Sequence, residues 1–144
     1  LFFDNKKKTI CVLSATTILK LLLPESQTNK KIYYSFEKLI EDLNYDDWIK
    51  SYIYWELFLI KELGFEIDLP NKITLTDINK NKIEINDKFF TVPSFFLKND
   101  DASISKIEIK EALAFNKNLL IENFMIPNNL QMPFSRNILE KYYN

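Results

Sequence analysis

Glycine is nearly absent from this sequence, and its one occurrence marks the end of a helix. Gly64 is the only glycine among 144 residues, and it follows an apolar helical pattern from Tyr52 to Leu63. At the residue after a helix, glycine adopts a left-handed backbone at a cost roughly 1 kcal/mol lower than other residues. The sequence therefore predicts that the helix ends at Leu63 and that Phe65 folds back onto its last turn.

Histidine is absent and cysteine occurs once, which excludes several kinds of catalytic site. Ser-His-Asp triads, Cys-His pairs, histidine metal sites and glycine-rich phosphate loops cannot be built. Carboxylates remain as candidate acids, bases or Mg²⁺ ligands. They are Asp46-Asp47, Glu56, Glu62 and Asp100-Asp101. Helix starts, solvated helix faces and loops explain most of these carboxylates more simply, so we expect a protein that is not an enzyme and has no cofactor or metal.

The single cysteine and the lack of a long apolar run indicate the cellular compartment. Cys11 has no internal disulfide partner and lies in an apolar helical stretch, which indicates a small core residue and a reducing environment. No apolar run of about 18 residues is present, and the sequence has no signal-peptide pattern. We expect a cytoplasmic protein with no membrane partner. The sequence begins at Leu1 rather than Met, so we also expect it to be part of a longer protein.

Positive charge is carried almost entirely by lysine. Arg136 is the one arginine among 19 basic residues, and the formal net charge is −1. Contact with nucleic acid therefore requires a local patch. The candidate DNA contacts are Lys6, Lys7, Lys8, Lys117, Arg136 and Lys141. The competing interpretation is a solvated lysine-rich surface with no ligand.

The hydrophobic pattern predicts three helices in the first half of the chain. The first covers Lys8–Leu23 and is closed by Pro24. The second is capped by Asn29 or Thr28, and the third is opened by Asp46 or Asp47. Tyrosine and phenylalanine are so frequent that some must reach the surface. The tyrosines considered for base stacking or a pocket are Tyr33, Tyr34, Tyr52, Tyr54, Tyr142 and Tyr143.

The second half begins with alternating residues and then returns to helix. Lys72–Thr76 and Lys82–Asn86 predict a β-hairpin with its turn at residues 77–81. A helix starting at Ser105 or Asp101 follows, and Ser135 is expected to cap the last one. The expected fold is mainly α: a single helical bundle over residues 1–144, with a small β-hairpin insertion at residues 70–92.

Several segments, taken together, resemble a known family. They are Leu22-Leu23-Pro24-Glu25, Tyr33–Ile40, Trp55–Leu69, Val92–Leu97 and Pro133–Arg136. Their order and spacing are similar to the C-terminal helical region of the bacterial recombination mediator RecO. Many relatives carry two Cys-x-x-Cys zinc pairs where this sequence has Lys72–Thr76 and Lys80–Lys88, with neither cysteine nor histidine. The resemblance therefore implies a degenerate zinc-finger-like hairpin without zinc.

The resemblance also implies a function. Members bind single- and double-stranded DNA without catalysis, engage the C-terminal tail of single-stranded DNA-binding protein, and act with RecR to load RecA. An N-terminal OB-fold domain is expected upstream of the helical region. The alternative is a helical interaction or scaffold domain with no nucleic-acid role. Convergence of the basic candidates on one face favours the mediator, whereas scattered lysines suit a scaffold.

The third helix carries the expected partner pocket. Lys50, Tyr54, Leu57 and Lys61 match part of the family's tail-binding region, although Ile53-Tyr54 stands where some relatives have arginine. An apolar hole with a basic rim suits a terminal phenylalanine carboxylate. Glu56 has three candidate roles: a buried hydrogen-bonded group, a solvated residue beside Lys50 and Lys61, or a partner contact.

Overall fold

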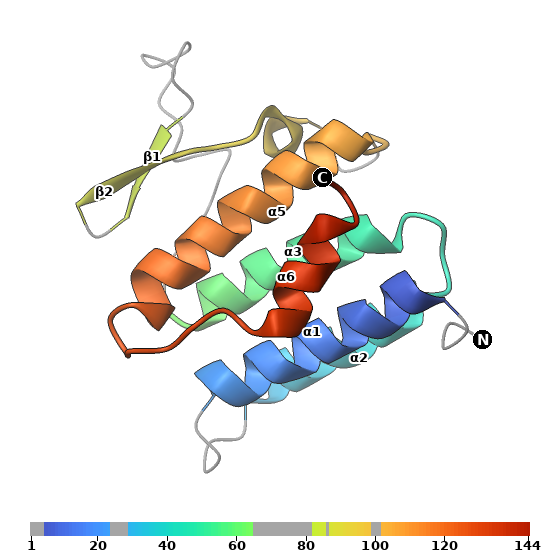
Figure 1. Ribbon diagram of the computed structural model, residues 1–144, viewed down its shortest axis with the longest axis horizontal. Helices are drawn as coiled ribbons and strands as arrows, with labels where there is room; N and C mark the ends of the chain where they lie inside the picture. The colour runs from blue at the N-terminus through green and yellow to red at the C-terminus, as the bar shows by residue number, and fades with distance from the viewer. Residues whose placement is uncertain (1–4, 24–28, 65–81, 86, 99–101) are drawn as a thin grey trace.

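Five α-helices make up most of the described part of the chain. The computed structural model describes residues 5–23, 29–64, 82–85, 87–98 and 102–144. The elements are α1 (Lys6–Leu22), α2 (Lys30–Asp42), α3 (Trp48–Glu62), β1 (Lys82–Ile85), β2 (Lys88–Thr91), α5 (Lys106–Leu120) and α6 (Phe134–Lys141). The predicted mainly α fold with a small hairpin is confirmed (Figure 1).

Helix α3 lies at the centre of the bundle. It packs against both α2 and α5, while α1 packs against α6 (Figure 1). Nine of the 15 residues of α3 are buried, so this helix has no broad polar face. By contrast, α2 buries only Ile32 and Leu39 and presents a wide surface to solvent. The core therefore forms around α3, and α2 provides a large exposed face.

Asparagine side chains set the starts of the first two helices. The Asn5 side chain accepts hydrogen bonds from the backbone N–H groups of the first turn of α1. The helix consequently begins at Lys6, two residues before the predicted Lys8. Asn29 accepts a hydrogen bond from the backbone N–H of Ile32 and caps α2. Of the two predicted caps for α2, the asparagine is the one that is used.

Two further helix boundaries are set by residues next to them, at the start of α5 and the end of α3. Ser105 and Glu108 form a capping box at the start of α5, in which each side chain accepts a hydrogen bond from the backbone N–H of the other residue. At the end of α3, Leu63 is the C-cap and Gly64 has φ of 114°. A side chain is strained at that φ, which confirms the predicted stop. Phe65, predicted to fold back, lies outside the described residues.

The described hairpin contains one predicted strand and one that was not predicted. Strand β1 corresponds to the second predicted strand, but its antiparallel partner is β2, with Ile83 opposite Phe90 and Ile85 opposite Lys88. In the short connection, Asp87 has φ of 65°, which Asp tolerates better than most residues. The predicted turn at residues 77–81 and the strand before it lie outside the described residues. The alternating pattern identified β1 and did not predict β2.

The start of the last helix also differs from the prediction. Helix α6 begins at Phe134 after Pro133, so Ser135 lies in the first turn and is not the cap. Its Oγ lies 3.0 Å from Oγ1 of Thr17 and so joins α6 to α1. The fixed φ of proline suits the position before a helix, and this residue replaces a capping serine. Between α5 and α6, the chain first continues through a π-helical turn at Ile121–Met125.

Aromatic rings connect the segment after the hairpin to α3 and α5. Phe95 and Phe96 lie in a short 3₁₀ turn, Ser94–Leu97, and both are buried. The Tyr54 ring lies 6.2 Å from that of Phe95 and 5.8 Å from that of Phe96. Phe115 of α5 lies 5.7 Å from Phe96. These distances are typical of favourable aromatic pairs, and they fix this segment against the bundle.

Cys11 is a core residue, as predicted. Its side chain is fully buried in α1. Burial, and then the nearby Glu56 carboxylate, raise the pKa of its thiol far above the ordinary value. The thiol therefore stays protonated and behaves as a small apolar group.

Candidate nucleic-acid and partner surfaces

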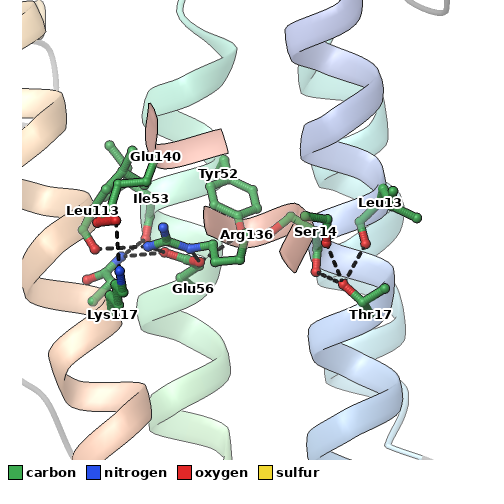
Figure 2. A network of polar contacts seen from close by, with 12 residues as sticks. Leu13, Ser14, Thr17, Tyr52, Ile53, Glu56, Leu113, Lys117, Arg136 and Glu140 are labelled. Carbon is green, nitrogen blue, oxygen red and sulfur yellow. Dashed lines mark hydrogen bonds and ion pairs between the residues drawn. The ribbon is translucent and has the colours of Figure 1, made fainter. Parts of the chain in front are cut away.

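A buried ion pair between α3 and α6 organises the region beneath the candidate surfaces. Arg136 donates from Nε to Oε2 of Glu56 at 2.6 Å and from Nη2 to Oε1 at 3.1 Å (Figure 2). Both side chains are fully buried. Burial alone lowers the pKa of Arg136, but the adjacent Glu56 carboxylate outweighs it and the pKa is raised. The guanidinium therefore stays charged inside the protein.

Three more residues hydrogen-bond to this pair. The Tyr52 hydroxyl donates to Oε2 of Glu56 at 2.7 Å, and Asn116 of α5 donates to Oε1 at 3.2 Å. Arg136 also donates from Nη2 to the Leu113 carbonyl at 2.9 Å (Figure 2). Buried charges are tolerated when they are paired and hydrogen-bonded in this way. Of the three roles considered for Glu56, the buried structural one is confirmed.

This arrangement corrects the prediction for Arg136. A DNA contact requires an accessible guanidinium, whereas that of Arg136 is enclosed and hydrogen-bonded to α3 and α5. The sequence did contain a signal for this role. Arginine is the residue suited to a rigid two-point pair with a carboxylate, and one arginine among 19 basic residues indicates a position where lysine does not substitute.

Lys7, at the start of α1, contacts the residues that follow α6. The Lys7 ammonium lies 5.7 Å from the ring centroid of Tyr142 and 5.4 Å from that of Tyr143, within cation–π range. Burial raises the pKa of Tyr143 to about 12, so its ring carries no charge at neutral pH. Lys141 precedes Tyr142 and is exposed. We call Lys6, Lys7, Lys8, Lys141, Tyr142 and Tyr143 the basic end.

Lys117 lies nearby but has its own partner. Its Nζ is 3.0 Å from Oε2 of Glu140, the residue before Lys141, and both side chains are largely shielded. Its charge is therefore neutralised locally. Of the six predicted DNA contacts, Lys7 contacts the residues that follow α6, Lys6 and Lys8 flank it in the first turn of α1, and Lys141 precedes the contacted tyrosines. Lys117 pairs with Glu140, and Arg136 is enclosed.

A groove between α2 and α3 contains half of the predicted partner pocket. Its volume is about 330 Å³. The described residues that line it are Ser35, Lys38, Leu39, Asp42, Asp47, Lys50, Ser51, Tyr54 and Trp55. Lys50 donates to the Ala102 carbonyl at 3.0 Å and lies 6.0 Å from the Phe95 ring. The groove therefore has an apolar wall beside a lysine held in place, together with acidic residues at its edge.

The other two predicted pocket residues lie elsewhere on α3. Leu57 is buried in the core and is absent from the described lining of the groove. Lys61 is exposed in the last turn of the helix. Lys38 and Trp55 were not among the predicted pocket residues. They line the groove because α2 packs against α3. The groove is limited to the first half of α3, because Leu57 is buried in the core and Lys61 lies in the last turn.

Within residues 5–23, 29–64, 82–85, 87–98 and 102–144, no three histidine, cysteine or carboxylate side chains are grouped so as to bind a metal ion. Among the helices in the same ranges, none has the length and apolar character needed to span a membrane.

Comparison with known proteins identifies the family. Residues 5–75 match the model of the family described as "Recombination protein O C terminal". The chain is 34% identical over 82 residues to the DNA repair protein RecO of Wolbachia pipientis subsp. Culex pipiens, a match that covers 56% of this chain and 34% of that protein. It is 24% identical over 159 residues to DNA repair protein RecO of Rickettsia peacockii, covering 99% of this chain and 66% of that protein.

The chain belongs to the RecO family. The RecO of Ehrlichia chaffeensis is also similar, with 33% identity over 89 residues that cover 60% of this chain and 36% of that protein. In each of these comparisons the chain spans less than two thirds of the relative. No solved structure matches it. All three of these relatives are named as DNA repair proteins.

Proposed function

We propose that this chain is the helical module of a non-catalytic recombination mediator, and that its basic end binds the phosphates of single- and double-stranded DNA. The observation that supports the proposal is the contact of Lys7, in the first turn of α1, with the rings of Tyr142 and Tyr143, the two residues that follow Lys141. Phosphate contacts by lysine supply affinity without sequence preference. A mediator needs contacts of that kind.

The proposal extends to the rest of the longer protein. An OB-fold upstream of residues 1–144 adds a second nucleic-acid surface, and the whole protein acts in the bacterial cytoplasm, associated with the nucleoid, and works with RecR to load RecA. The groove between α2 and α3 receives the acidic, phenylalanine-ended tail of single-stranded DNA-binding protein. Tyr54 and Trp55 provide the apolar wall and Lys50 provides the positive charge.

Salt-dependent binding of duplex DNA tests the basic end. The variant K6Q/K141Q removes two exposed charges from it and leaves the Lys7 contact with the tyrosines intact. The matched control K106Q/K110Q removes two exposed charges from α5. We expect the first variant to weaken binding and to reduce the slope of log K against log salt by about 2. The control should leave both quantities close to those of the wild type.

The result also separates the mediator from the scaffold alternative. If neither pair of substitutions changes DNA binding, or if wild-type protein does not bind DNA, the basic end is not a DNA site. Equal loss in the two variants indicates a diffuse electrostatic attraction with no specific surface.

A fluorescent peptide ending in Asp-Phe-Pro-Phe tests the groove by polarisation. We expect saturable binding that is lost when the terminal phenylalanine is removed and weakened by K50Q. Because Lys61 lies outside the lining of the groove, K61Q is the charge-matched control. Binding that depends on Lys61 and not on Lys50 contradicts this placement of the pocket.

A further inference from the structure

A second groove lies where the end of α1 meets the start of α2. Its volume is about 490 Å³. The described residues that line it are Leu19, Leu23, Asn29, Lys30, Ile32, Tyr33, Tyr34 and Phe36. Tyr33 and Tyr34 remain 61% and 64% exposed, although large aromatic side chains are usually well covered. The described lining is thus mostly apolar, with two accessible rings and one charged residue.

We propose that this groove binds an unpaired nucleobase of single-stranded DNA, with Lys30 contacting the adjacent phosphate. The proposal rests on the DNA-binding function above and adds to it a contact that distinguishes single strands from duplex. It assigns strand selectivity to the α1–α2 groove and general phosphate affinity to the basic end.

The two tyrosine rings are held in positions that suit stacking. Their centroids are 6.1 Å apart with an interplanar angle of 69°, an edge-to-face arrangement. A hydrogen bond to the Glu37 carboxylate raises the pKa of Tyr33, so its hydroxyl is protonated and anchored at neutral pH. Restricting the rings before binding reduces the ordering cost of recognition. Aromatic side chains of this kind stack bases of any sequence.

The charges around the groove favour a polyanion. Lys30 is the only charged residue among its described lining residues. Lys31 follows it on α2, and Lys20 lies in the last turn of α1; both are exposed. Glu37 is the acidic residue that the structure places next to this groove, and its carboxylate is engaged with Tyr33. A flat apolar group attached to a phosphate therefore matches the groove better than a neutral apolar ligand does.

Geometry makes this contact specific for unpaired bases. In duplex DNA the bases are already stacked on one another and paired, so their faces are not available to a protein groove. The phosphates of a duplex remain accessible to exposed lysines. Lys6 and Lys20 lie 14 positions apart in α1, which places the two surfaces roughly 21 Å apart along the helix axis at a rise of about 1.5 Å per residue. Substitutions at one surface should therefore leave the other intact.

Fluorescence anisotropy with labelled oligothymidine and a blunt duplex tests the proposal. The variant is Y33A/Y34A, and Y45A is the control because Tyr45 is also an exposed tyrosine, 63% accessible, but lies outside the groove. We expect Y33A/Y34A to weaken binding of oligothymidine about 10-fold, within the range measured for loss of a base-stacking ring. Duplex affinity should not change. Y33F/Y34F keeps both rings and removes the Tyr33–Glu37 hydrogen bond, so it should retain most of the affinity for oligothymidine.

The outcomes distinguish this proposal from the one on which it rests. Equal weakening for both DNA probes, or no change for either, overturns the single-strand site. If Y33A/Y34A abolishes binding of the Asp-Phe-Pro-Phe peptide but not of oligothymidine, the groove is a peptide site and the proposal is wrong. If K6Q/K141Q has no effect while Y33A/Y34A still reduces oligothymidine binding, DNA binding by the basic end is contradicted. The single-strand site in the groove is then supported.

Discussion

Arg136 of α6 and Glu56 of α3 are 80 positions apart in the sequence and form a two-point ion pair with both side chains fully buried. Tyr52 and Asn116 hydrogen-bond the same carboxylate, so the pair connects α3, α5 and α6. The packing of α5 and α6 on α3 therefore includes one shared buried ion pair. Substitutions in this pair are the most informative test of stability.

Removing Arg136 alone should destabilise the fold strongly. R136M leaves the Glu56 carboxylate buried without its cation, and breaking a buried pair in this way costs about 3–5 kcal/mol. The free energy of unfolding in urea, measured by circular dichroism, provides the comparison. The double variant E56Q/R136M should be less destabilised than the sum of E56Q and R136M, because neither charge is left alone. A loss below about 0.5 kcal/mol for R136M, the range of ordinary surface substitutions, contradicts the role given to the pair.

The Tyr52 hydroxyl should contribute more to stability than that of Ser14. Tyr52 donates its one proton to Glu56 and lies 2.7 Å from the Ser14 hydroxyl, which therefore donates to Tyr52. Burial, and then the Glu56 carboxylate, raise the pKa of Tyr52, so it remains a donor at neutral pH. Y52F removes a bond to a buried charge and should cost roughly 1–3 kcal/mol, against about 1 kcal/mol for S14A. The same urea titrations measure both, and a larger loss for S14A reverses the inferred donor order.

Gly64 should be sensitive to substitution through its backbone alone. A Cβ built at this position meets no atom within 4 Å, but the φ of 114° disfavours every residue with a side chain. G64A should therefore lower stability by about 1 kcal/mol, which corresponds to a Tm decrease of roughly 3 °C for a domain of this size. Thermal unfolding followed by circular dichroism measures the shift. An unchanged Tm shows that the end of α3 adapts to a side chain.

The capping box of α5 should show a pH-dependent contribution from Lys98. The Lys98 hydrogen bond at 2.7 Å, and then the backbone N–H of Ser105, lower the pKa of Glu108 from its ordinary value of 4.5. Because the folded-state pKa is depressed, this stabilisation is present above the unfolded value and is lost as pH falls through the folded value. K98M should therefore have a lower Tm than the wild type at pH 7, and the difference should disappear in acid.

S105A provides the control for that experiment. The Ser105 Oγ accepts a bond from the backbone N–H of Glu108, which does not titrate. Its loss should cost roughly 1 kcal/mol at neutral pH and should persist in acid. If the K98M difference is independent of pH, the ion pair does not cause the depressed pKa.

Helix boundaries that depend on a few neighbouring residues could be predicted from the sequence. Asn29, Ser105 and Gly64 set helix boundaries through hydrogen bonds and backbone angles within one turn, and each was among the predicted positions. Helical periodicity located the buried α3 in the same way, because side chains three and four residues apart share a face. The resemblance to RecO rested on this kind of information and is confirmed.

Tertiary structure decided which distant segments meet. Glu56 is buried because Arg136 is held 2.6 Å away by the packing of α6, and nothing near either residue in the sequence encodes that distance. The partner of β1 and the lining of the grooves likewise depend on which elements cross. Caps and helical periods arise from interactions over three or four residues, so the sequence alone determined them. Pairing and burial of charge arise between surfaces brought together by folding. Folding therefore left Lys6, Lys7 and Lys141 exposed and buried the one arginine.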